Sequence, residues 1–96
     1  GTPYFASMEK KPQENYLNVF PNPSNKTFTF SFGITEDASI MIYDASGKEV
    51  YMIRVEKNDK QAVWEAGNYE QGMYYAQLIS FKGKKKSGEK KLLLVK

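Results

Sequence analysis

The sequence contains no cysteine and no histidine among its 96 residues. The absence of cysteine excludes disulfide bonds and thiol nucleophiles, and the absence of both residues excludes Cys/His zinc sites. Without histidine, the chain also lacks the side chain that enzymes use most often for general acid–base catalysis. Most familiar catalytic centres are therefore excluded, and we predict that the chain is not an enzyme.

Long apolar runs are absent as well. The longest is Leu92–Val95, far below the ~20 residues that a membrane-spanning helix needs. Apolar residues at helical spacing fit no segment for more than about two turns. We therefore predict a domain without a convincing helix that does not span a membrane.

Charge is distributed unevenly along the chain. Residues 1–81 carry seven Lys or Arg and ten Asp or Glu, whereas residues 82–96 carry seven Lys and only Glu89. A basic segment can bind nucleic acid, an anionic surface or an acidic protein, or its lysines can simply protect a sheet edge from aggregation. Nucleic acid is disfavoured because Gly and Ser, rather than aromatic residues, separate the lysines of residues 82–91.

From Asn15 onward, short apolar or alternating runs are separated by turn residues about every ten positions, which is typical of an all-β sandwich or barrel. Alternation is clearest in 26–32, where every second residue is Phe. The longest apolar-rich run, 73–81, is predicted to be a central strand. The predicted strands are 16–20, 26–32, 38–43, 50–55, 61–65, 73–81 and 84–95, the last bulged at Ser87–Gly88. The predicted core contains Phe28, Phe30, Ile40, Ile42, Leu78 and Leu94.

Turn residues and prolines define the organisation of the chain. Asp44–Gly47 is predicted to be a hairpin turn, because an Asp side chain can cap its own backbone and Gly tolerates positive φ. Residues 1–14 contain Pro3 and Pro12 and show no sustained period. We predict that they form a linker from an upstream protein and that residues 15–96 form one domain.

Candidate chemistry is sparse. Glu65, Glu70 and Asp59 lie in or beside predicted loops, where carboxylates are usually solvated rather than paired for hydrolysis. Asp44–Gly47 is too short for a calcium loop, and phosphate-binding glycine loops are missing, so no metal or cofactor is predicted. Aromatic residues could form a platform for sugars, although most occupy alternating strand positions typical of a core. Those to check for exposure are Tyr4, Phe5, Tyr51 and Tyr69.

Four sequence blocks occur in a specific order. They are Asn18–Pro23, Ile42–Val50, Trp64 followed by Gly72–Tyr75, and Lys90–Lys96. In this order the blocks resemble the C-terminal sorting domain (type A) of type IX secretion cargo proteins of Bacteroidetes, over about Leu17–Lys96. The resemblance implies an immunoglobulin-like antiparallel β-sandwich of about seven strands. Such a domain serves as a secretion and sorting signal for an upstream cargo protein.

The resemblance also implies partners and a route. The domain would cross the periplasm, bind the outer-membrane translocon and its shuttle protein, and reach the cell surface or the medium. A sortase-like signal peptidase would cut in the linker ahead of Tyr16. By position, the recognition residues would be Gly72, Tyr74, Tyr75, Lys90, Lys91, Leu92, Leu93, Leu94, Val95 and Lys96.

One alternative function stays open at the level of sequence. The chain could be an accessory sandwich of an extracellular enzyme, similar to a fibronectin type III or carbohydrate-binding module. In that case Trp64 and the tyrosines would bind glycan. The two hypotheses place function in the C-terminal strand or on an aromatic face, respectively.

Overall fold

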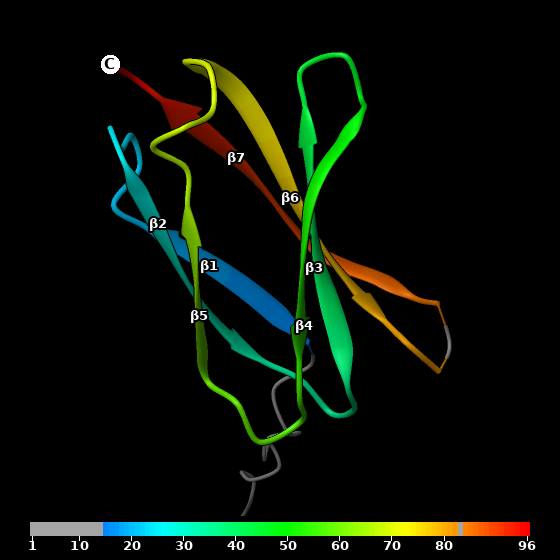
Figure 1. Cartoon of the computed structure of the whole chain (residues 1–96). Coiled ribbons are helices and arrows are strands. Elements are labelled where there is room, and N and C mark those ends of the chain that lie inside the picture. Colours follow the sequence, from blue (N-terminus) through cyan, green and yellow to red (C-terminus); the bar gives the residue numbers. More distant parts are fainter. Residues whose placement is uncertain (1–14, 83) are drawn as a thin grey trace, which may run out of the picture.

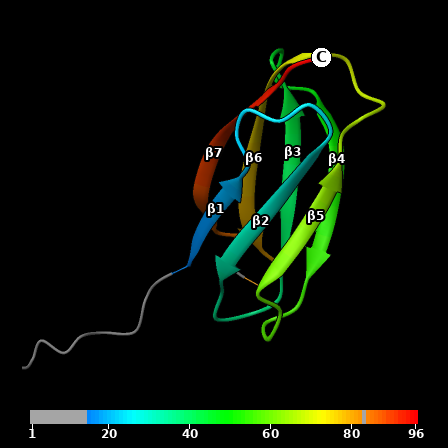
Figure 2. The same cartoon turned by 90° about the vertical axis from the view of Figure 1, so that its left-hand side faces the viewer.

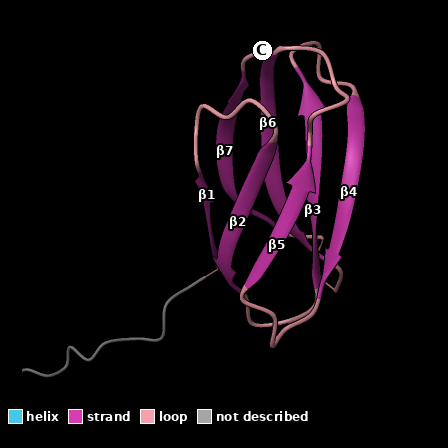
Figure 3. Cartoon of the chain, turned by 60° about the vertical axis from the view of Figure 1, so that its left-hand side comes forward, coloured by secondary structure: helices cyan, strands magenta, loops and turns pink. Residues whose placement is uncertain are grey.

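The computed structural model describes residues 15–82 and 84–96, which form seven β-strands and no helix (Figure 3). The strands are β1 (Tyr16–Phe20), β2 (Thr27–Gly33), β3 (Ala38–Asp44), β4 (Glu49–Val55), β5 (Gln61–Glu65), β6 (Gly72–Ser80) and β7 (Lys86–Leu94). Each predicted strand is present, with ends within two residues of the prediction, so the all-β prediction is confirmed. The predicted linker, residues 1–14, lies outside the described residues.

The strands form two antiparallel sheets that pack face to face (Figure 2). One sheet has the order β1-β2-β5 and the other the order β4-β3-β6-β7. β6 is therefore an interior strand, as its apolar sequence predicted. The result is an immunoglobulin-like sandwich in which β4 pairs with β3, whereas the fourth strand of a constant-type immunoglobulin domain joins the sheet of the first two strands.

The turn between β3 and β4 explains why β4 lies in this sheet. The Asp44 carboxylate accepts hydrogen bonds from the Ser46 hydroxyl (2.7 Å), the Ser46 backbone N–H (3.0 Å) and the Lys48 backbone N–H (3.0 Å). These bonds, that of the Ser46 hydroxyl foremost, lower the pKa of Asp44 below its ordinary value. Gly47 completes the turn with a φ of +90°. A connection this short returns the chain beside β3 rather than across to the other sheet.

The core lies between the inner faces of the two sheets. All residues that alternation assigned to it are buried: Phe28, Phe30, Ile40, Ile42, Leu78 and Leu94. Trp64 on β5 is buried too, and its ring stacks on that of Phe28 with centroids 5.8 Å apart. The predicted inward faces of β2 and β3 are thus confirmed.

β7 carries a bulge one residue later than the predicted Ser87–Gly88. Because Ala76 pairs with Lys90 and Leu78 with Ser87, the two residues Gly88 and Glu89 together face Gln77. Gly88 has a φ of +65°, and a Cβ atom at this position would lie 2.9 Å from Cβ and 3.0 Å from N of Leu17. Glycine therefore permits both the left-handed conformation and the close approach of β1 to β7, where the two sheets meet.

Candidate functional site

The β6–β7 hairpin brings together the two blocks that the sequence predicted to carry recognition. The blocks are separated along the chain by residues 76–89, yet they lie on neighbouring antiparallel strands (Figure 1). The register pairs Gly72 with Leu94, Met73 with Leu93, Tyr74 with Leu92, Tyr75 with Lys91 and Ala76 with Lys90. Val95 and Lys96 follow directly after β7. The predicted recognition residues therefore lie next to one another on β6, β7 and the two residues that follow β7.

Strand alternation divides these residues between two faces. Tyr74, Leu92 and Leu94 point into the sandwich, where all three are buried. A partner of the folded domain cannot contact these side chains. They support the hairpin from inside, and any contribution they make to recognition passes through the shape of the fold.

The outward positions form a strip that a partner can reach. It consists of Met73, Tyr75, Lys91, Leu93 and Val95, which we call the outer strip. Met73 and Leu93 pair across the two strands and are each 37% exposed, and Val95 is 40% exposed. Sequence reasoning did not select Met73, although its position two residues before Tyr75 places it on the same face.

Tyr74 anchors the beginning of the hairpin. Its ring packs edge-on against Trp64 at a centroid distance of 5.4 Å, and its hydroxyl donates a hydrogen bond to the Glu70 carbonyl at 2.6 Å. Burial, followed by the charges of Glu70 and Asp44, raises the pKa of the Tyr74 phenol. Tyr74 therefore stays neutral and ties the loop of residues 66–71 to β6.

Trp64 is part of the core, so the alternative prediction that it stacks on glycan is wrong. Only 1% of this residue is exposed. Tyr69 packs edge-on against its ring at 5.0 Å, and Tyr51 stacks at 6.3 Å. Tyr51 is itself exposed, but the Trp64 ring on which it stacks is buried. Tyr4 and Phe5 lie outside the described residues.

Gly72 begins β6 with a φ of +148°, and no atom lies within 4 Å of the position that a Cβ would take. Its backbone conformation, rather than lack of space, therefore favours glycine here. The residue positions the following strand so that Tyr74 points inward and Tyr75 outward.

A second segment contacts β7 along its outer edge. The Asn22 side chain donates to the Lys91 carbonyl (2.7 Å) and accepts from the Leu93 N–H (3.0 Å). Ser24 continues the pattern, since its N–H donates to the Leu93 carbonyl (3.0 Å) and its carbonyl accepts from the Val95 N–H (2.9 Å). We call Asn22 and Ser24 the clasp. Asn22 lies in one of the recognised sequence blocks, but its contact with a strand about 70 residues away could not be read from the sequence.

The basic residues occupy different environments. Lys96 Nζ donates to the Gly67 carbonyl at 2.6 Å, which ties the chain beyond β7 to the loop of residues 66–71. Lys90 is half-buried and Lys91 is exposed. The exposed cluster of Lys82 and 84–86 lies at the opposite end of the hairpin, away from the three-stranded sheet (Figure 1). The cluster is thus separate from the lysines of the terminal block.

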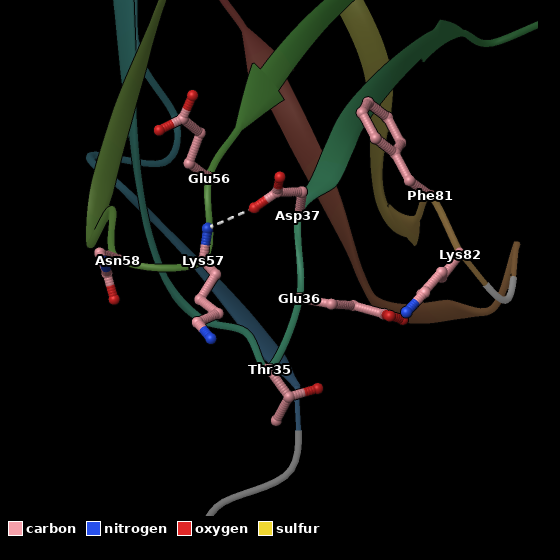
Figure 4. A pocket seen from close by; sticks show the side chains of 8 residues that line it. All are labelled: Thr35, Glu36, Asp37, Glu56, Lys57, Asn58, Phe81 and Lys82. Atoms are coloured by element: carbon pink, nitrogen blue, oxygen red, sulfur yellow. Dashed lines mark hydrogen bonds between the residues drawn. The ribbon is translucent and has the colours of Figure 1, made fainter.

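A hollow of about 640 Å³ lies at the end of the sandwich opposite to Lys96. Three loops line it, and Figure 4 shows the Asp37 carboxylate accepting a hydrogen bond from the Lys57 backbone N–H, at 2.9 Å. Other charged side chains that line the hollow include Glu36, Glu56 and Lys82. Asp37 thus joins the β2–β3 connection to the β4–β5 connection, which is a structural role.

Among residues 15–82 and 84–96, no group of three or more Asp, Glu, His or Cys residues is arranged to hold a metal ion. Within the same residues, no helix is both long and apolar enough to cross a membrane.

Comparisons with known proteins agree with the geometry. The sequence model of the secretion system C-terminal sorting domain matches residues 18–95. The fold is similar to part of the crystal structure of dimeric latent PorU from Porphyromonas gingivalis, with a TM-score of 0.68 and 22% sequence identity. That likeness covers 91% of this chain and 10% of the PorU chain, so the domain spans about a tenth of that protein. No curated protein sequence matches the chain significantly.

The structure defines a small all-β module of two packed antiparallel sheets. The chain belongs to the secretion system C-terminal sorting domain family, the secretion signals of type IX cargo proteins. It therefore interacts with the secretion machinery and directs an attached cargo to the cell surface or outside. The family is not a catalytic one.

Proposed function

We propose that the folded domain is recognised by the outer-membrane translocon and the shuttle protein of the type IX system, after the cargo has reached the periplasm. The β6–β7 hairpin is the recognition element in this proposal. The observation that carries it is the pairing of Gly72–Tyr75 with Lys91–Leu94. Two distant sequence blocks that resemble a sorting signal become a single surface only when the sandwich is folded.

Burial separates the residues of the hairpin that can contact a partner from those that support its structure. Tyr75, Lys91, Leu93 and Val95 offer side chains to a partner, because they lie on the outer face of β6, β7 and the residue beyond. Gly72, Tyr74, Leu92 and Leu94 hold the hairpin in place from inside or through the backbone. Lys91 is the lysine of the terminal block that lies on the outer strip, whereas Lys90 pairs with the buried Ala76 and so occupies the other face of β7. Lys96 adds positive charge beside the loop of residues 66–71, to which it donates a hydrogen bond. The domain acts by binding alone and needs no metal, cofactor or catalytic residue.

The first test removes charge from the terminal block. The full chain is fused to a secreted reporter, and Lys90, Lys91 and Lys96 are all replaced by Gln. Lys91 and Lys96 are exposed and Lys90 is half-buried. Replacing exposed lysines usually changes stability within about 0.5 kcal/mol, whereas removing charge from a docking surface slows association. We expect the fusion to fold normally and its arrival at the cell surface to fall.

The matched control replaces Lys82, Lys84 and Lys85 by Gln, which removes the same charge from the far end of the hairpin. We expect this variant to be exported at the wild-type rate. Normal export of a folded Lys90/Lys91/Lys96 variant would show that these lysines are only solvated charges. Equal losses in both triple variants would instead assign the effect to the total charge of residues 82–96.

Residues 1–14 are the linker to the cargo in this proposal and contain the bond that a sortase-like signal peptidase cuts. The absence of sequence periodicity and the two prolines support it. Limited proteolysis of the full chain, with mass spectrometry of the products, should give first cuts in residues 1–14 and spare the sandwich. First cuts within β6 would contradict the proposed domain boundary.

A further inference from the structure

The edge of β7 near its end is closed by the clasp. Residues 91, 93 and 95 direct their backbone groups toward this edge, and a free edge of this kind can accept an added strand from a partner. Here the Lys91 carbonyl, both backbone groups of Leu93 and the Val95 N–H are already bonded to Asn22 or Ser24. A partner cannot add a strand along these residues while the clasp is closed.

The outer face of the same hairpin differs from this edge, because Met73, Leu93 and Val95 expose apolar side chains there. Across the sheet, Tyr75 pairs with Tyr43 on one side and with Lys91 on the other. The face continues through Met41 and Met52, which pair with each other on β3 and β4. Flexible methionine side chains adapt to the shape of a protein partner.

The charged residues of β7 indicate which groups a partner would carry around an apolar contact with the outer strip. Lys86 pairs with Ile79 and Lys91 with Tyr75, so both lysines occupy outward positions at the β7 side of the face. Glu89 is the only acidic residue of this strand. A partner surface with an apolar centre and carboxylates opposite these two lysines would be complementary.

We infer that the secretion machinery binds the outer strip of Met73, Tyr75, Lys91, Leu93 and Val95 face-on, through a protein surface that is apolar with carboxylates at its rim. The clasp keeps the edge of β7 closed during this contact. The inference rests on the proposed function, since it specifies how the hairpin is recognised. It also assigns Asn22 and Ser24 a positioning role: they hold β7 with its outer side chains turned toward the partner.

The principal test is Leu93→Ser in the full chain fused to a reporter. This change removes an exposed apolar side chain and leaves the backbone bonds to the clasp in place. Central apolar contacts often dominate binding, and we expect type IX-dependent reporter at the cell surface to fall about tenfold. Val63→Ser is the matched control, because Val63 is 47% exposed on the outer face of the other sheet. It should stay within about twofold of wild type.

Two further variants keep the test informative if Leu93→Ser folds poorly. Lys91→Gln and Lys91→Glu retain the apolar surface, and carboxylates on the partner should make the Glu variant the worse of the two. Asn22→Ala frees the Lys91 carbonyl and the Leu93 N–H at the edge of β7, while the two backbone bonds of Ser24 remain. Face-on binding predicts that export of this variant does not rise. Thermal unfolding of each purified chain establishes which variants are folded.

Several outcomes would overturn the inference. If a folded Leu93→Ser variant is exported at the wild-type level, the outer strip is excluded as the binding surface. Increased export of Asn22→Ala would assign recognition to the edge of β7. A dimer in sedimentation, or binding to vesicles of anionic phospholipid, that Leu93→Ser abolishes would assign the face to a second copy or to a membrane. A failure of the proposed function is distinguishable from these outcomes. In that case the wild-type fusion would be exported equally in strains with and without the type IX system.

Discussion

The outer faces of the two sheets differ in their central strands. On the three-stranded sheet, β2 presents the polar residues Thr27, Thr29 and Ser31. The central strands of the four-stranded sheet instead present mainly apolar side chains, which are Met41, Tyr43, Met73, Tyr75 and Ile79, with Ser39 and Gln77 as the polar positions. Both sheets bury their other face in the same core, so burial of the core does not explain the difference. Tyr43, Tyr75 and Met73 form an apolar patch on this face, and an apolar patch that the fold does not cover is typical of an interaction surface.

Individual apolar side chains on the three-stranded sheet do not change this comparison. Phe20 and Val63 are each 47% exposed, but Thr29 lies between them and pairs with both. Thr27 adds a hydrogen bond from its hydroxyl to the Glu65 carboxylate, at 3.2 Å. The face is therefore interrupted by polar groups, whereas Tyr43 and Tyr75 are direct neighbours on the other sheet.

The largest expected effect comes from the core that both sheets share. Phe30→Ala should lower the free energy of unfolding by about 3 to 5 kcal/mol, because it removes a buried ring and leaves a cavity. Thr29→Ala, one residue earlier and on the outer face, should cost less than about 0.5 kcal/mol. Urea unfolding of both variants tests the assignment of inner and outer faces. A loss below about 1 kcal/mol for Phe30→Ala would contradict it.

The next effect concerns the junction of the two sheets. Gly88→Ala should cost about 2 to 4 kcal/mol, since the new Cβ must adopt a left-handed conformation and also overlaps Leu17. Gly47→Ala provides the comparison, because Gly47 has positive φ but open space around it. It should cost only about 1 kcal/mol. Equal costs in urea unfolding would mean that β1 does not approach β7 closely.

A smaller effect is expected at the clasp, which joins the loop after β1 to the edge of the other sheet. Asn22→Ala removes two exposed hydrogen bonds and should cost about 1 kcal/mol. Amide hydrogen exchange gives a sharper readout, because the Leu93 N–H loses its acceptor and should exchange faster. Asn25→Ala, in the same loop, is the control. Unchanged exchange at Leu93 would show that the clasp is not formed in solution.

The smallest effect is a pH dependence at the β3–β4 turn of the four-stranded sheet. The pKa of Asp44 is lower in the folded state than in the unfolded state, so its ionised form stabilises the fold at pH values above the unfolded pKa. This contribution is lost as the pH falls through the folded pKa. Thermal unfolding should therefore show a shallower decline below pH 5 for Asp44→Asn than for wild type. Parallel curves would exclude a stabilising role of the carboxylate.

Much of the fold followed from local patterns. Alternation in β2 and β3 identified the inward residues Phe30 and Ile40, because strand geometry fixes the face of every second side chain. The Asp44–Gly47 turn predicted a β3–β4 hairpin, since its residue types allow a tight reversal. The blocks of the terminal hairpin are also visible in the sequence, but their membership of a block does not say which side chains face a partner. Position in the chain alone therefore places the buried Leu92 and the exposed Leu93 in the same recognition block.

The sequence by itself determined the strands, the core faces, the bulge at Gly88 and the membership of a sorting-domain family. Tertiary structure alone decided that Trp64 is covered, that Asn22 closes the edge of β7, and that Met73 joins Leu93 in one exposed strip. The physical reason is range. Strand period and turn chemistry depend on neighbouring residues, whereas burial, edge pairing and surface continuity depend on segments far apart in the chain that meet only when the two sheets pack.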